Sequence, residues 1–370
     1  MFDEQLLDRL RSEVVRGTVS MRGSYEDYCI FKYSQNCVID DAWNGTNRQA
    51  RGIIFYAPTG RIVCRPFDKF FNLDERQETK LESLPDSSFI IWEKLDGSCC
   101  SSFNMWGEIC ISTPGSYESE QAVWATKWLR EYLDSINKKK EFFELNTNMT
   151  FIFEGIWPEE AGNPASPVLN YGDRQELVLL SIRKHNGLEL SPPKVDLYAE
   201  EFGFTRPKRY DSSVNPLSRE MKDAIPDNEE GYVIQYPGNK HFRVKVKSPT
   251  YMLLHRTRDK ISYKGLCEIM EGGESRRWIE SLPKHMTRRA DDILAELNQE
   301  YYSIFYAVED KFKEARVLKK RKEQALYILG SDLPKSYTGL VFAMLDDKFN
   351  DRLIWGILKK EKRFQSVEID

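Results

Sequence analysis

Short hydrophobic runs of four to eight residues recur between about residues 28 and 250, and turn residues separate them. Runs that are rich in β-branched and aromatic residues and bounded by glycine, proline or aspartate are typical of β-strands. One longer segment, residues 118–137, instead spaces its apolar positions for one face of a helix. Strands with an occasional helix predict an α+β fold rather than a doubly wound parallel sheet. The predicted strands read CIFKYS, RGIIFY, RIVCRP, SFIIWEK, TFIFEGI, LVLLSIR, GYVIQY and HFRVKV.

The pattern changes after residue 250, where the apolar spacing becomes that of amphipathic helices. We therefore predict a strand-rich domain over residues 1–250 and a helical domain over residues 251–370. The chain has neither a G-x-G-x-x-G string nor a Walker A string, so Rossmann and P-loop phosphate sites are not expected. The helices predicted in the second domain cover residues 286–310, 311–329 and 350–362.

Composition narrows the class of protein only a little. The net charge is -4, which does not indicate a nucleic-acid-binding protein, although residues 251–370 carry a mild positive excess. No apolar run is long enough to span a membrane, and the acidic amphipathic start does not resemble a secretory signal. Seven cysteines without a C-x-x-C pair indicate reduced thiols, and four histidines without i, i+4 spacing do not indicate a histidine-built metal site. We expect a cytoplasmic protein.

The segment Trp92–Ser98, WEKLDGS, is the first candidate for chemistry. It places Lys94 directly after an apolar run and two residues before an Asp-Gly turn. A solvated hairpin explains this pattern as well as a nucleophilic lysine does. A K-x-D-G string occurs by chance in about one chain of this size in ten, so other residues must decide.

Lys245 and Lys247 are two residues apart in a predicted strand, so they project from the same face. Either this face is solvated, with Val244 and Val246 pointing inward, or two ammonium groups meet one phosphate. If Lys94 lies nearby, the positive charges are expected to lower its pKa and make it a better nucleophile.

Two glutamates stand in or beside strands that otherwise read as core. Glu154 interrupts FIFEGIW, and Glu230 precedes Gly231 at the start of GYVIQY. A partly buried carboxylate needs hydrogen-bond donors, a cation or a metal. Glu230 could hold a divalent ion bound to phosphate oxygens, and either glutamate could instead form a salt bridge.

Seven strings in this order resemble a known family: RGIIF, RPFDKFFNL, EKLDGS, FIFEG, LVLLSIR, EGYVI and FRVKVKSPTY. They resemble the ATP-dependent RNA ligases of the bacteriophage T4 RNA ligase 1 type, in the superfamily of lysine-dependent nucleotidyltransferases. The resemblance covers about residues 28–251. It implies a nucleotidyltransferase fold of antiparallel sheets with helices, followed by an all-helical C-terminal domain that helps to select the RNA.

By this resemblance the enzyme joins the 5′-phosphate and 3′-hydroxyl ends of RNA through a lysyl-AMP intermediate on Lys94. The implied cofactors are ATP and Mg²⁺ or Mn²⁺, and the implied substrate is single-stranded RNA or a cleaved tRNA. The resemblance also implies a role in RNA repair and a separate kinase-phosphatase that prepares the ends. It further implies a monomeric state.

The resemblance also assigns roles to individual residues. Lys245 and Lys247 would act with Lys94 in catalysis by holding the α-phosphate, and Glu230 would bind the metal. Asp96 and Gly97 would shape the turn that presents the nucleophile. Arg51 and Lys69 would contact the outer phosphates and Glu154 the ribose. The full ATP-binding set is Arg51, Lys69, Phe71, Asp96, Gly97, Glu154, Leu180, Val233, Lys245, Lys247 and Tyr251, with Leu180 and Val233 as walls around the adenine.

One departure from the family concerns Pro114, which stands where a basic residue normally precedes Gly-Ser. Proline offers neither a charge nor a backbone N–H, so one phosphate contact is in doubt. Two other hypotheses stay open: a DNA ligase or capping-type nucleotidyltransferase, and an RNA-binding protein with a decayed site. The basic segment 311–322 could dock on phosphates or form a solvated helix face.

Overall fold

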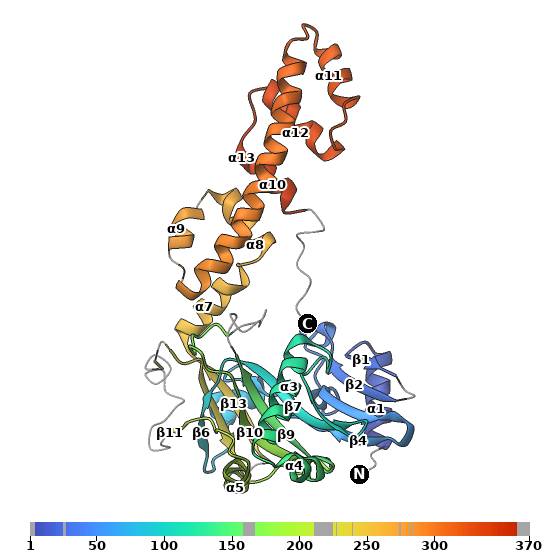
Figure 1. The fold of residues 1–370 in the computed structure, drawn as a ribbon, viewed down its shortest axis with the longest axis vertical. Coiled ribbons are helices and arrows are strands. Elements are labelled where there is room, and N and C mark those ends of the chain that lie inside the picture. Colours follow the sequence, from blue (N-terminus) through green and yellow to red (C-terminus); the bar gives the residue numbers. More distant parts are fainter. Residues whose placement is uncertain are drawn as a thin grey trace. The chain divides into compact units, whose positions relative to one another are not determined.

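The computed structural model describes residues 4–24, 27–157, 167–210, 225–226, 228–238, 240–273, 275–280, 282 and 284–360. The chain divides into two compact units, Met1–Met252 and Leu253–Asp370. The first contains every strand that the structure describes, and the described part of the second is helical (Figure 1).

Three sheets form the first unit. All strand pairs within them are antiparallel except the pair of β13 with β5. The first sheet has the order β1 (Val19–Gly23), β2 (Tyr28–Tyr33), β3 (Arg51–Tyr56), β4 (Arg61–Cys64). The second has the order β10 (Glu176–Lys184), β9 (Met149–Ile156), β7 (Ser98–Met105), β8 (Glu108–Ser112). The third has the order β11 (Arg209–Tyr210), β6 (Ile90–Lys94), β12 (Gly231–Tyr236), β13 (Phe242–Lys247), β5 (Phe71–Asn72).

The structure confirms the α+β class and contains all eight predicted strands, as β2, β3, β4, β6, β9, β10, β12 and β13. The sequence analysis did not predict β8 (EICIS) or β7, whose string SCCSSFNM reads as polar. Ser102 is nevertheless buried, and its Oγ donates to Asn146 Oδ1 at 2.5 Å and accepts from the backbone N–H of Phe151 at 2.9 Å. A hydroxyl with a partner on each side is compatible with a core strand.

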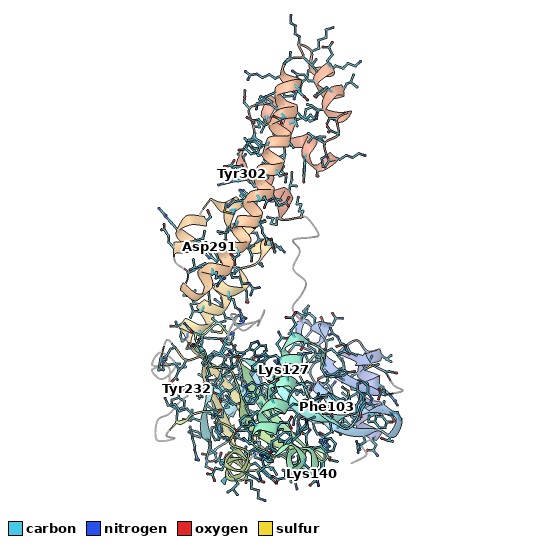
Figure 2. The ribbon with its side chains drawn as sticks, in the orientation of Figure 1. Phe103, Lys127, Lys140, Tyr232, Asp291 and Tyr302 are labelled. Atoms are coloured by element: carbon cyan, nitrogen blue, oxygen red, sulfur yellow. The ribbon has the colours of Figure 1, made fainter. Side chains whose placement is uncertain are left out.

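Helices pack against the first and second sheets. The helix predicted over 118–137 is α3 (Glu120–Ser135), which packs Ala125, Leu129 and Leu133 into one core with β7, β8 and β9 (Figure 1). Phe103, labelled in Figure 2, joins β7 to a second core with Ile30 and Ile54 of the first sheet. The other helices of this unit are α1 (Glu4–Val15), α2 (Gln35–Ile39), α4 (Lys139–Asn146) and α5 (Pro192–Phe202).

The helices of the second unit surround their own core. The predicted break between residues 310 and 311 is wrong, because α10 (Lys284–Arg316) is one continuous helix of 33 residues. The third predicted helix is α13 (Asp351–Leu358), and residues 361 and 362 lie outside the described residues. No helix in the described part of the chain is both long and apolar enough to cross a membrane. The remaining helices are α7 (Pro249–Asp259), which begins in the first unit, α8 (Tyr263–Gly272), α9 (Ser275–Glu280), α11 (Arg321–Leu329) and α12 (Lys335–Leu345).

Candidate active site

The third sheet brings Lys94 next to the two-lysine strand. Lys94 ends β6, and the strand register places it opposite Gly231 of β12, which in turn lies opposite Lys247 of β13. Gly231 has φ 143°, and a Cβ at this position would lie 2.0 Å from the carbonyl oxygen of Val246. Lys94, Gly231 and Lys247 thus form one row across β6, β12 and β13. Only glycine fits at its middle position, between the two lysines.

Glu230 bridges these lysines. Its Oε2 lies 2.6 Å from Lys94 Nζ, its Oε1 lies 3.1 Å from Lys247 Nζ, and the side chain is 2% exposed. Val244 and Val246 are buried on the opposite face of β13, as the inward-valine alternative required. The lysine face is nevertheless part of the candidate site. The salt bridge foreseen as an alternative for Glu230 is present here.

The carboxylates set the charge of Lys94. Burial by itself favours the neutral amine, but Glu230 and Glu154 outweigh burial, so the pKa of Lys94 is raised above its usual value. The expectation that Lys245 and Lys247 would lower this pKa is therefore wrong. The bridging carboxylate dominates, and Lys94 rests as an ammonium ion.

Glu154 lies on β9, beside the turn that follows Lys94. Its Oε1 accepts a hydrogen bond from the backbone N–H of Gly97 at 3.1 Å. Burial raises the pKa of Glu154 to about 7, with Glu230 adding to the shift and Lys94 opposing it. A Cβ on Gly97 would lie 2.5 Å from the carbonyl oxygen of Gly155, so this turn also needs glycine.

Asp96 anchors the turn rather than facing an open site. Its carboxylate is buried and accepts the backbone N–H groups of Val168 at 2.5 Å and Leu169 at 2.9 Å. It also accepts the hydroxyl of Tyr251 at 2.9 Å, and its own N–H donates to Tyr171 Oη at 2.9 Å. Asp96 and Tyr251 therefore position Lys94. The sequence treated Tyr171 only as part of a turn and missed this contact.

Lys245 and Arg51 form the cationic side of the site. Burial, followed by the charges of Arg51 and Lys69, lowers the pKa of Lys245 to about 6. Among the described residues Lys245 has no carboxylate within ion-pair distance, and its Nζ lies 4.7 Å from the centre of the Phe70 ring. Arg51 contacts the same ring at 5.5 Å, and its buried Nη1 has no hydrogen-bond partner in the described part of the chain. Such unpaired cations fit an anionic ligand.

We expect ATP binding to be coupled to proton uptake by Lys245. A phosphate beside its amine would raise the pKa above about 6. Affinity for ATP should then be greatest below pH 6 and should fall as the pH rises towards the higher pKa of the complex. Isothermal calorimetry in buffers of different ionisation enthalpy would measure the uptake at pH 7.5. Lys245→Met should remove it, and unchanged uptake in that variant would refute the assignment.

Lys69 is held in an aromatic cage. Its Nζ lies 5.5 Å from the ring centre of Tyr33, 5.6 Å from that of Trp43 and 5.2 Å from that of Phe71. Burial, with a smaller contribution from Arg51, lowers the pKa of Lys69. Phe71 thus contacts Lys69 as the sequence suggested. Tyr33 and Trp43 were missed because they precede Lys69 by 36 and 26 positions, and no local pattern connects residues so far apart.

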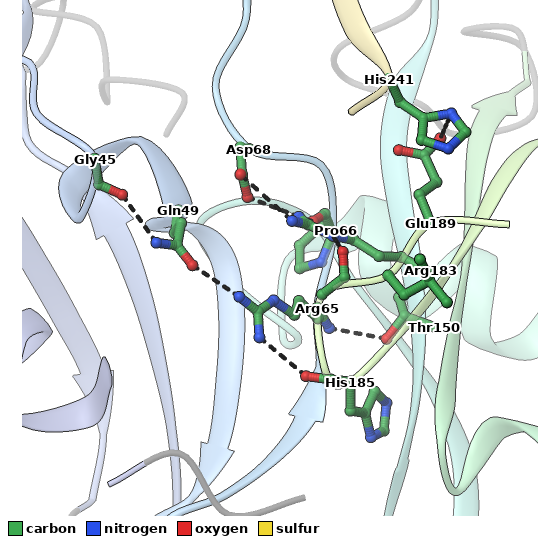
Figure 3. Close-up of polar contacts among 12 residues, drawn as sticks. Gly45, Gln49, Arg65, Pro66, Asp68, Thr150, Arg183, His185, Glu189 and His241 are labelled. Carbon is green, nitrogen blue, oxygen red and sulfur yellow. Dashed lines mark hydrogen bonds and ion pairs between the residues drawn. The ribbon is translucent and has the colours of Figure 1, made fainter. Parts of the chain in front are cut away.

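Polar contacts between sheets fix the segment that leads to Lys69 (Figure 3). Arg65 donates from Nη2 to Gln49 Oε1 at 2.8 Å and from Nη1 to the carbonyl oxygen of His185 at 3.0 Å. Arg183 forms an ion pair with Asp68 at 2.7 Å. The chain before Lys69 is thereby attached to both β10 and the loop before β3, which limits where the lysine can lie.

Val233 and Leu180, the residues predicted to line the adenine, have fewer contacts to the other candidate site residues. Val233 lies opposite both Trp92 and Lys245 in the strand register, so it shares the face of Lys94. Leu180 lies at a bulge of β10 in a different sheet, where its carbonyl accepts from Arg206 at 2.7 Å. Their roles as walls around adenine stay predictions.

In the second unit, most cations of segment 311–322 are paired with carboxylates. Lys311 lies 3.3 Å from both Glu314 and Asp332, and Lys313 lies 2.9 Å from Glu309. Lys320 and Arg321 have acidic partners as well. This arrangement favours the solvated helix face over a phosphate-docking segment.

Comparisons with known proteins identify the family of the chain. A family model described as "RNA ligase", of the T4 RNA ligase 1 type, matches residues 49–251. A protein of Thermovibrio ammonificans named "Putative RNA ligase" is 30% identical over 257 residues, which cover 67% of this chain and 60% of that protein. An "RNA ligase" of Rhodothermus phage RM378 is 23% identical over 297 residues, covering 66% of this chain and 67% of that protein. The match thus spans less than two thirds of the first relative.

Two solved structures resemble the chain over most of its length at low similarity. One is titled "Putative ATP-dependent DNA ligase from Aquifex aeolicus", with a TM-score of 0.49, 15% identity, and coverage of 93% of this chain and 99% of that chain. The other is an archaeal ATP-dependent RNA ligase, with a TM-score of 0.48, 15% identity, and coverage of 93% and 96%.

Proposed function

The chain belongs to the RNA ligase family of the T4 RNA ligase 1 type, and we propose that it joins RNA ends in an ATP-dependent reaction with Lys94 as the nucleophile. One observation carries the proposal. The amine of Lys94 lies 2.6 Å from buried Glu230 and in one sheet row with Lys247, beside the unpaired cations Lys245 and Arg51. A nucleophilic amine beside cations that lack partners suits attack on a polyphosphate.

In the first step Lys94 Nζ attacks the α-phosphorus of ATP. Only the neutral amine reacts, so the ammonium must first lose its proton. Glu230 Oε2 lies 2.6 Å from Lys94 Nζ and would accept this proton. A nitrogen–phosphorus bond forms, the bond to the bridging oxygen breaks, and pyrophosphate leaves with the bonding electrons. Lys245 and Lys247 would stabilise the charge that develops on the α-phosphate.

In the second step a 5′-phosphate oxygen of the RNA attacks the same phosphorus, and the bond to Lys94 breaks. The strand then carries AMP, and Lys94 regains a proton. In the third step the 3′-hydroxyl attacks the activated 5′-phosphate, loses its proton, and AMP leaves as the phosphodiester forms. Each transition state is anionic, so positioning and cationic side chains supply the catalysis.

A divalent ion fits the carboxylates beside Lys94. The described residues contain no cluster of three or more metal-ligating side chains, but magnesium commonly takes one or two carboxylates together with phosphate oxygens and water. Glu230 and Glu154, which interact electrostatically, offer this minimal set. When bound, the ion would neutralise charge on the phosphate oxygens. We propose Mg²⁺, with Mn²⁺ as a substitute.

The two units would have different roles in the reaction. We propose that the first unit carries out adenylyl transfer and that the second contributes to the choice of RNA. Broken tRNA or another single-stranded RNA is the proposed substrate, with a separate kinase-phosphatase to prepare the ends. The family match supports the first assignment because it lies within residues 49–251, and the second rests on the earlier resemblance alone.

The test is incubation with radiolabelled ATP and Mg²⁺ or Mn²⁺, followed by denaturation. We expect label from α-labelled ATP to stay on the protein and label from γ-labelled ATP to be lost with pyrophosphate. The labelled enzyme should then join single-stranded RNA and cleaved anticodon loops better than nicked duplex DNA. Labelling by GTP alone would point to a capping enzyme, and no label with either nucleotide would overturn the proposal.

A further inference from the structure

Lys32 is a cation beside the site that the proposed reaction does not use. It lies near the end of β2, opposite Arg51 of β3 in the strand register. The register shifts between Phe31 and Lys32, where Gly52 is the extra residue of a bulge, so Arg51 and Gly52 together face Lys32 across the strand pair. Lys32 therefore extends the cationic side of the site outward from Arg51.

The loop between β8 and α3 closes over this position. A Cβ placed on Gly52 would lie 2.9 Å from the Cα of Pro114, so the loop packs directly on the backbone next to Arg51. The N–H of Thr113 donates to the carbonyl oxygen of Ser116 at 2.8 Å, which holds the turn closed. Pro114 contributes neither a charge nor an N–H to this turn.

The ammonium of Lys32 reaches the same turn. A Cβ placed on Gly115 would lie 3.2 Å from Lys32 Nζ and 3.3 Å from its Cδ. The lysine stem thus lies along the glycine, and the charge comes to the loop from the neighbouring sheet. The absence of a side chain at Gly115 leaves the room that this arrangement needs.

The charge of Lys32 is not balanced by a carboxylate. No ion pair joins it to an acidic side chain in the part of the chain that the structure describes. Its neighbour Arg51 also has a buried nitrogen without a partner there. Like charges at paired strand positions are destabilising unless an anion lies between them. The pair is therefore arranged for a bound anion.

We propose that Lys32 binds a phosphate group together with Arg51, and so supplies from β2 the positive charge that Pro114 does not supply from the loop. The proposal rests on the proposed ligase function. The phosphate comes either from the outer part of the ATP triphosphate or from the 5′ end of the RNA strand. Both sources present the same doubly charged oxygens, so binding measurements with each must separate them.

Direct binding to full-length protein tests this without relying on activity. Inorganic tripolyphosphate represents the first source, and a 5′-phosphorylated RNA oligonucleotide, compared with its 5′-hydroxyl form, represents the second. We expect Lys32→Met and Lys32→Gln to weaken binding of one of these probes about tenfold, the effect of losing one charge-assisted bond. Lys32→Arg should retain most of the affinity because it keeps the charge.

The control is Lys127→Met, which removes an exposed lysine of α3 in the same unit (Figure 2). It should bind both probes like the wild type, and the melting temperatures of all variants should agree. Unchanged affinity of Lys32→Met and Lys32→Gln for both probes would overturn the proposal. A wild-type protein that binds phosphate but is never labelled by ATP would instead overturn the proposed function and leave the Lys32 site standing.

Discussion

Replacing Lys94 by alanine should abolish the covalent AMP label and lower the joining of ordinary 5′-phosphorylated RNA by a factor on the order of 10³ or more. The reason is the loss of the amine that carries AMP. The third step does not use a free lysine, so the variant should still seal a strand that already carries AMP at its 5′ end. Denaturing gels of the labelled protein and of both RNA substrates would measure these effects.

Lys94→Arg separates nucleophilicity from charge. A guanidinium keeps a positive charge beside Glu230 but does not lose its proton in proteins, so it cannot attack phosphorus. We expect this variant to remain unlabelled. The fold should tolerate either change, because buried Glu230 keeps its ion pair with Lys247 at 3.1 Å. Labelling of folded Lys94→Ala would show that another residue is the nucleophile.

Replacing Asp96 by alanine should damage both stability and labelling. The carboxylate accepts two backbone N–H groups and the Tyr251 hydroxyl, and all three would lose their partner in a buried position. A buried donor without an acceptor costs about 1–3 kcal/mol. We therefore expect the free energy of unfolding to fall by about 3–5 kcal/mol, as breaking a buried charged network does.

Tyr251→Phe is the matched control, because it removes only one of the three donors. It should lower the free energy of unfolding by about 1–2 kcal/mol and leave most of the labelling. Urea unfolding of the full chain would give the order of stabilities. Hydrogen exchange of the amides of Val168 and Leu169 should accelerate in Asp96→Ala and much less in Tyr251→Phe. Equal effects of both changes would contradict the anchoring role of Asp96.

Sequence reasoning placed Lys245 and Lys247 on one face because strand periodicity reports which residues share a face. Lys245 and Lys247 alternate with buried valines, and this alternation held in the structure. Strand periodicity could not give the sign of the pKa shift of Lys94. That sign depends on the distance of Glu230, which comes from a segment more than 130 positions away and meets Lys94 only through the pairing of β6 with β12.

Residues that act through long-range contacts were missed for the same reason. Tyr33 and Trp43 surround Lys69, and Tyr171 fixes the turn after Lys94, yet none lies in a string that points to phosphate chemistry. The polar strand β7 was missed because its Ser102 finds partners on α4 and β9, which the sequence does not bring together.

The sequence alone determined which residue types stand at which strand positions: the lysine before Asp-Gly, the alternating lysines, the two glutamates, and the change from strands to helices. Periodicity and turn chemistry are local, so they can be read along the chain. Only the tertiary structure decided that Glu230 bridges two lysines, that Asp96 is an anchor, and that Lys32 reaches the turn of Pro114. Charge, burial and hydrogen bonding depend on distances between segments, and those distances exist only once the sheets have paired.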